Sequence, residues 1–198
     1  SSGEVCLKDL FSKSDSEIFG TNPLNIDSIA WLICRGGWPR ATTTDKDVAL
    51  DMAYRYYEAV VNSDISRVDN VRRDAERAKR ILRSIARNQC AQVSVNTICA
   101  DVEDNDSTSA NRITITSYID ALKKIFVLED SPAWNPNLRS KTAIRSSNTR
   151  YFSDPSIGVA ALGIGPNDLI NDIRTMGLFF ESLCVRDLRV YADSLEGS

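Results

Sequence analysis

Positive charge gathers between residues 131 and 153, a segment that contains no aspartate or glutamate. The segment carries Arg139, Lys141 and Arg145. Guanidinium and ammonium groups bind the phosphates of nucleic acids, and such contacts supply most of the affinity of non-specific binding. The pattern fits a basic wing that lies along a nucleic-acid groove, and it fits the alternative equally well. A flexible, solvated loop is the alternative.

A second set of basic groups precedes this segment, on a helix predicted for residues 111–125. Arg112, Lys123 and Lys124 are its cations, and short threonine side chains lie between them. Such groups can reach phosphates or the edges of bases. Asp120 on the same helix opposes this interpretation, because its carboxylate repels phosphate.

A third basic set lies on a helix predicted for residues 72–89. Spacings of four, three and seven residues bring side chains back to one side of a helix. Arg73, Arg77, Arg80 and Arg87 have these spacings. The face could follow a phosphate backbone, but we favour a solvated face that is paired in part with nearby acids.

Several kinds of catalysis are excluded by residue type. The chain has no histidine, which removes Ser-His-Asp triads, Cys-His dyads and histidine zinc sites. Its five cysteines include no closely spaced pair, so we expect reduced thiols in a cytoplasmic protein. Glu181 stands alone on an apolar helix, where we favour a structural role over metal binding. We therefore predict no catalytic residue, no metal site and no enzyme activity for this chain.

Composition limits where any nucleic-acid binding could occur. The chain has 198 residues, 42% of them apolar, and a net charge of −3. A core is therefore available, and attraction to phosphate must come from a local patch rather than from the whole surface. The sequence contains no apolar run of about 18 residues, the length that a membrane span needs, so we expect no membrane partner.

The elements that position these groups follow from hydrophobic periodicity. Helices are predicted over residues 26–34, 44–60, 72–89, 93–102, 111–125 and from 166 to the end, with short strands at 126–128 and 151–152. On the last helix Ile173, Met176, Phe180, Leu183 and Leu188 keep helical spacing. The fold class is therefore mainly α with a small β-hairpin. Three helices followed by two strands are typical of a winged helix.

Five strings, in this order, resemble a known family. They are GGWPRA at 36–41, RSIARN at 83–88, SANRITITSYIDALKKIFVLEDSPAW at 109–134, RYFSDPSIGVAALG at 150–163 and GLFFESLCVRDLRVYA at 177–192. The chain resembles the C-terminal region of prokaryotic AAA-type ATPases that carry a DUF4143 region. The resemblance extends over nearly the whole chain.

The resemblance implies a division into three parts. Residues 1–71 would be a lid-like helical region, residues 72–153 a winged-helix domain, and residues 154–198 the start of a nuclease-like region. No Walker A lysine and no Walker B strand is present, so ATP and Mg²⁺ are implied only for an absent ATPase core. We expect the chain to be a fragment of a longer protein.

Two functions remain open at this point. The first is DNA binding by an accessory region of an ATPase, with Arg112, Lys123 and Lys124 on the helix and Arg139, Lys141 and Arg145 on the wing as the contacts. The second is a protein-interaction module that docks on its own ATPase core or on a neighbouring subunit. Exposed tryptophans would favour the second, because aromatic side chains are enriched at interfaces.

Overall fold

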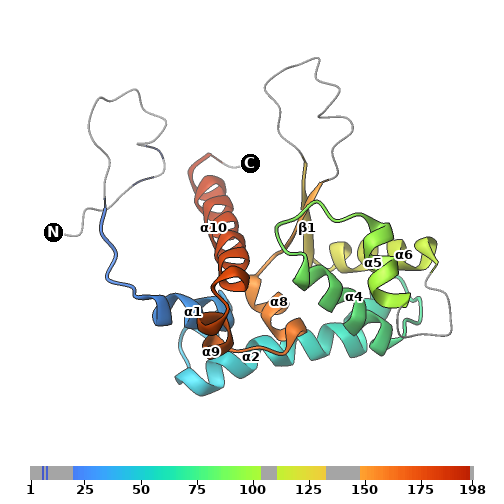
Figure 1. The fold of residues 1–198 in the computed structure, drawn as a ribbon, viewed down its shortest axis with the longest axis horizontal. Helices are drawn as coiled ribbons and strands as arrows, with labels where there is room; N and C mark the ends of the chain where they lie inside the picture. Colours follow the sequence, from blue (N-terminus) through green and yellow to red (C-terminus); the bar gives the residue numbers. More distant parts are fainter. Residues whose placement is uncertain (1–5, 7, 9–19, 104–110, 133–147, 197–198) are drawn as a thin grey trace, which may run out of the picture.

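The computed structural model describes Cys6, Lys8 and residues 20–103, 111–132 and 148–196, and it confirms a mainly helical fold with a small antiparallel sheet. In Figure 1, α2 runs along one edge of the molecule, α8 lies near its centre, and α10 and the hairpin both project from the opposite side. The helices are α1 (Ile26–Arg35), α2 (Lys46–Ala59), α3 (Ile65–Arg67), α4 (Ala75–Arg87), α5 (Val95–Glu103), α6 (Arg112–Lys124), α8 (Pro155–Leu162), α9 (Pro166–Asn171) and α10 (Ile173–Glu196), with a wide turn η2 (Val60–Asp64) after α2.

Helices α4, α5 and α6 pack on one another and lead directly into the hairpin. Asp74 caps α4 by accepting a hydrogen bond from the amide of Arg77, and Asn111 caps α6 by accepting one from the amide of Ile113. Such caps satisfy amides that the first helical turn leaves without partners. The predicted order of three helices and a hairpin is therefore present.

The hairpin joins β1 (Leu128–Ser131) to β2 (Thr149–Phe152), with Leu128 opposite Phe152 and Ser131 opposite Thr149. The strand predicted at residues 126–128 is wrong in position. Phe126 has a φ of 56° and its side chain is 76% exposed, so it belongs to the turn that ends α6. A left-handed residue of this kind ends helices and breaks a strand.

A large core cluster joins the chain from Tyr57 to Ala161. Its members come from α2, η2, α3, α4, α5, α6, both strands and α8. The cluster contains residues from both sides of positions 71 and 153, where the sequence analysis places the boundaries between domains. The three-part division stays a prediction.

Helix α8 is the centre of the fold, since every residue from Pro155 to Ala161 is buried. Gly158 allows this close packing, because a Cβ atom there would lie 2.7 Å from the ring of Phe179 and 2.9 Å from that of Phe152. A second core cluster links α8 through Val159 to α1, α9 and α10. Helix α8 thus connects the hairpin side of the molecule to the α10 side.

The helix predicted from residue 166 to the end is broken at Asp172, between α9 and α10. The carboxylate of Asp172 accepts hydrogen bonds from the amide and the hydroxyl of Thr175, so it starts a new helix. Helix α10 then runs for 24 residues. Among the described residues no helix combines the length and the apolar character needed to cross a membrane.

Candidate nucleic-acid interface

Helix α6 buries one face and leaves the other in solvent. Ile115, Tyr118, Ile119 and Leu122 are buried against α3, α4 and α5. The helical period then directs the remaining positions outward. The outer face holds Arg112, Ile113, Thr116, Asp120, Lys123 and Lys124, of which Thr116 and Lys123 are partly covered.

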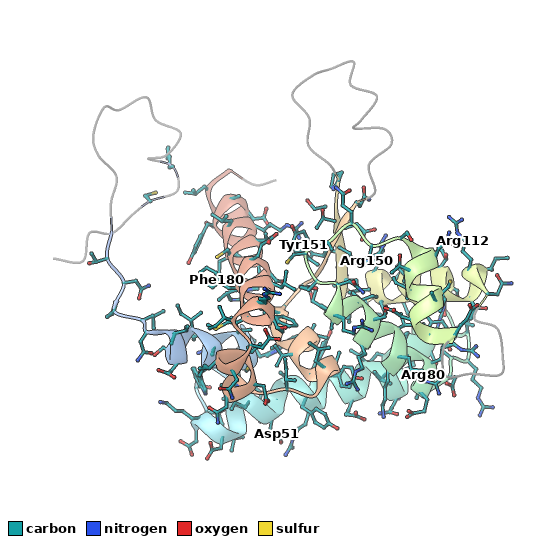
Figure 2. The ribbon with its side chains drawn as sticks, viewed as in Figure 1. Asp51, Arg80, Arg112, Arg150, Tyr151 and Phe180 are labelled. Atoms are coloured by element: carbon teal, nitrogen blue, oxygen red, sulfur yellow. The ribbon has the colours of Figure 1, made fainter. Side chains whose placement is uncertain are left out.

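Two of the predicted basic contacts are exposed to solvent on this face. Arg112 and Lys124 are exposed, at opposite ends of α6. In Figure 2, Arg112 lies at the end of α6 that is far from the hairpin. Lys124 lies four residues before β1. The two cations are therefore spread along the helix rather than concentrated at one point.

Lys123 has a different environment. Its ammonium group forms an ion pair with Asp130 on β1, and Arg150 on β2 donates a hydrogen bond of 2.9 Å to the same carboxylate. Burial raises the pKa of Asp130, but the hydrogen bonds from Arg150 and Lys123 outweigh burial and hold this pKa below its usual value. Lys123 therefore anchors α6 to the hairpin.

Arg139, Lys141 and Arg145 lie outside the described residues. The strands on either side of them are described and show where the segment starts and returns. It leaves β1 at Ser131 and re-enters β2 at Thr149, and these two residues are paired partners. The acid-free segment is therefore attached at the end of the hairpin, which points away from α4 and α2 (Figure 1).

The predicted arginine face on α4 is wrong for Arg73. This residue lies before α4 and its side chain is only 2% exposed. It donates two hydrogen bonds of 2.7 and 2.8 Å to the carboxylate of Asp69. It also donates to the backbone oxygen of Ile65 and to the hydroxyl of Ser117 on α6. The hydrogen bond from Arg73 lowers the pKa of Asp69 to about 2. Arg73 is thus a buried link between the α3–α4 connection and α6.

The other members of that face are also engaged in part. Arg87 lies 3.8 Å from Asp101 on α5, and Asp101 accepts a hydrogen bond of 2.6 Å from Ser84. Arg77 and Arg80 are half-buried. The solvated face that the sequence favours is therefore only partly present.

A buried polar junction, which the sequence did not predict, ties α8 to α1 and α10. Asp154 is 7% exposed and caps α8 through the amide and hydroxyl of Ser156. Its carboxylate also accepts hydrogen bonds from the amide of Gly37, at 2.8 Å, and from Arg186, at 2.6 Å. A Cβ atom on Gly36 would lie 2.4 Å from the hydroxyl of Ser156, so the junction explains this glycine. The donors around the carboxylate of Asp154 all bind it, so this junction holds α8, α10 and the residues after α1 together as a structural lock.

Trp31, Trp38 and Glu181 lie outside the basic surface formed by α6 and the hairpin. Trp31 and Trp38 are half-buried, and Trp134 lies outside the described residues. Glu181 accepts a hydrogen bond of 3.4 Å from the hydroxyl of Tyr151. No cluster of three or more potential metal ligands occurs in the part of the chain that the structure describes.

The cysteines are free thiols, and two of them are held protonated. Burial raises the pKa of Cys34 to about 12, and Asp168 adds to the effect. Burial also raises the pKa of Cys90 to about 12, together with the charge of Glu181. A thiol of this kind is a poor nucleophile at neutral pH, because the reactive species is the thiolate.

The comparisons with known proteins correct the family that the sequence suggested. The matching family model is described as a domain of unknown function, DUF8612, and it covers residues 26–168. No curated protein and no solved structure matches the chain. The resemblance to AAA-type ATPases carrying a DUF4143 region is therefore wrong, and the ATPase core implied by it has no support. The chain belongs to the family of DUF8612 domains.

Proposed function

We propose that this protein binds nucleic acid through the outer face of α6 and the acid-free segment of the hairpin. One observation carries the proposal: α6, with Arg112 and Lys124 exposed, is followed at once by the hairpin, and the sequence between its two strands contains Arg139, Lys141 and Arg145. Helix and hairpin are held together by the ion pair of Lys123 with Asp130. Several cations close together in one region can contact successive phosphates along one backbone.

The same face argues against strong readout of base sequence. Asp120 is exposed near its centre, and Ile113 is 76% exposed. The hydroxyl of Ser117 is occupied by Arg73. Affinity would therefore come mainly from phosphates, with little preference for sequence.

The test is fluorescence anisotropy of a labelled DNA duplex and a labelled single strand, at low and at near-physiological salt. With about five phosphate contacts, the logarithm of the binding constant should fall with the logarithm of salt at a slope of about −4.5 for the duplex. Charge reversal of Arg139, Lys141 and Arg145 together should abolish measurable binding. Absence of binding at low salt would overturn the proposal.

Neighbouring lysines provide a matched comparison. Lys124→Gln removes a free cation, so it should weaken binding about two- to fivefold and reduce the salt slope by about one unit. Lys123→Gln removes a cation that Asp130 already neutralises, so it should weaken binding less. Arg174→Gln, on α10, should have no effect. An equal effect of all three would indicate non-specific attraction.

A second candidate function is protein–protein association along α10, with a second copy of this chain as the partner. The outer face of α10 exposes large apolar side chains at spacings of three, four, seven and eight residues. They are Ile173, Phe180, Leu188, Tyr191 and Leu195, which are 42% to 56% exposed. Apolar stripes of this kind on a helix are typical of helix pairing.

A further inference from the structure

A pocket lies between α2 and the loop that connects α1 to α2. Its volume is about 500 Å³. It is lined by Trp38, Pro39, Arg40, Val48, Met52, Arg55 and Tyr56. The lining is apolar apart from the two arginines and the polar edges of the aromatic rings. Pockets of this size with a few polar groups are the usual sites for small ligands or for anchoring side chains.

The aromatic floor of the pocket is fixed in place. The indole N–H of Trp38 donates a hydrogen bond of 3.0 Å to the hydroxyl of Ser156 at the start of α8. The rings of Trp38 and Tyr56 pack with their centroids 4.4 Å apart. Because both rings are held by the core, a ligand would not have to order them, and binding would lose little entropy.

The wall formed by the loop is also fixed. The hydroxyl of Thr42 donates to the backbone oxygen of Pro39 at 2.7 Å, and that of Thr44 donates to the backbone oxygen of Arg40 at 2.6 Å. These bonds close a turn around Pro39, whose ring already restricts the backbone. The three consecutive threonines of the sequence thus have a local role in shaping this wall.

The two arginines at the rim of the pocket differ in their pairing. Arg55 is paired with Asp51 on the next turn of α2, at 2.5 Å. Arg40 is exposed and forms no ion pair with any residue that the structure describes. An uncommitted guanidinium beside an apolar pocket favours a ligand that carries an apolar group next to a carboxylate.

We infer that this pocket binds an acidic peptide, with one large apolar side chain seated between Val48, Met52 and Trp38 and a neighbouring carboxylate paired with Arg40. Aliphatic walls formed by Val48, Met52 and Pro39 suit an apolar side chain. A nucleobase would need hydrogen-bonding groups on the walls, where these residues offer none. This site lies on other elements than α6 and the hairpin, so it goes beyond the proposed nucleic-acid binding.

The experiment uses the full chain and a short fluorescein-labelled peptide in which one phenylalanine is flanked by glutamates. Binding is followed by fluorescence anisotropy and by the indole N–H resonance of Trp38. If the phenylalanine side chain is buried in the pocket, a peptide with serine in its place should bind at least about tenfold more weakly. A peptide with lysines in place of glutamates should bind more weakly as well.

Variants of the protein separate the pocket from general charge. Arg40→Glu should weaken binding of the acidic peptide about three- to tenfold, and Met52→Glu should weaken it at least about tenfold by placing a charge on the wall. Arg67→Glu is the control for the change of charge, since the side chain of Arg67 is 80% exposed and lies outside the pocket. Circular dichroism checks that each variant is folded.

The outcomes are distinct. Binding that depends on the phenylalanine, on Arg40 and on Met52, but not on Arg67, supports the inference. No binding of the acidic peptide, equal binding of the lysine peptide, or capture of a labelled oligonucleotide by the same pocket residues would each overturn it. Because Arg40 and Met52 take no part in the proposed nucleic-acid contacts, either proposal can fail alone.

Discussion

The two faces of α10 have opposite environments, although both are apolar. Phe179 is fully buried against α8, whereas its neighbour Phe180 is 44% exposed. Figure 2 places Phe180 on the side of α10 that faces away from Tyr151 and the hairpin. The comparison teaches that apolar character in a helix does not by itself say which face the fold uses.

The inner face accounts for the attachment of α10 to the body. Met176, Phe179 and Ser182 are buried, and Arg186 reaches Asp154 at the start of α8. The buried hydroxyl of Ser182 accepts a hydrogen bond of 2.7 Å from Gln89, which follows α4. These contacts already fix the helix, so the outer face is not needed for the fold. An exposed apolar stripe that the fold does not require indicates a docking surface.

The largest difference between the faces should appear in stability. Phe179→Ala opens a cavity beside Gly158 and Phe152, so we expect it to lower the free energy of unfolding by about 3–5 kcal/mol. Phe180→Ala removes a side chain that is 44% exposed, so we expect a loss below about 1 kcal/mol. Urea unfolding followed by circular dichroism measures both. Equal losses for the two variants would show that the outer face is part of the core.

The next largest effect concerns the two acids that bind Arg186. Asp154→Ala removes the cap of α8 and leaves Arg186 without its buried partner, so we expect a loss of about 2–4 kcal/mol. Asp187→Ala removes the partner that lies 2.8 Å from the same arginine but is 41% exposed. That loss should stay below about 1 kcal/mol. If the Asp187 variant were the less stable one, the junction at Asp154 would not be the lock between α8 and α10.

The helices that could be predicted are those with one buried face. Helices α4 and α6 were expected over residues 72–89 and 111–125 because their apolar residues recur at the helical period. Helix α8 could not be recognised in the same way. It is buried on every side, so its residues are uniformly small and apolar and no period remains.

On α10 the sequence shows a single apolar series that includes Ile173, Phe180 and Leu188. The structure places these three residues on the outer face, while Met176 of the same series is buried. Residues with helical spacing lie within a stripe about 100° wide on the helix surface. On α10 this stripe includes the border between the buried face and the exposed face. Spacing therefore found the helix but could not identify which side packs on the body.

The sequence shows where basic side chains occur but not which of them are paired with acids. Exposure of Arg112 and Lys124 agrees with the sequence analysis. The pairing of Lys123 with Asp130 and the burial of Arg73 depend on contacts between elements, and Arg73 meets Ser117 across 44 positions of the chain. A charged side chain looks the same in the sequence whether solvent or an acid neutralises it.

The smallest effect on stability is expected on the outer face, and it tests the second candidate function. Leu188→Ser and Tyr191→Ser, made together, replace side chains that are 51% and 54% exposed. We expect each to change the free energy of unfolding by about 0.5 kcal/mol or less. Sedimentation velocity over a range of protein concentrations should show association of the unmodified chain and none of the double variant, because pairing would bury this stripe.

A double variant at polar positions outside the stripe supplies the control for that experiment. Arg174→Ser together with Asp193→Ser changes two exposed side chains of α10 without removing apolar surface, so association should persist. An unmodified chain that stays monomeric at every concentration would reject pairing between copies. If the double variant of Leu188 and Tyr191 unfolds, the idea that only the inner face of α10 stabilises the fold is wrong, because the outer face would then be needed as well. Unchanged stability with lost association would separate the two faces of α10 into one that folds the protein and one that binds.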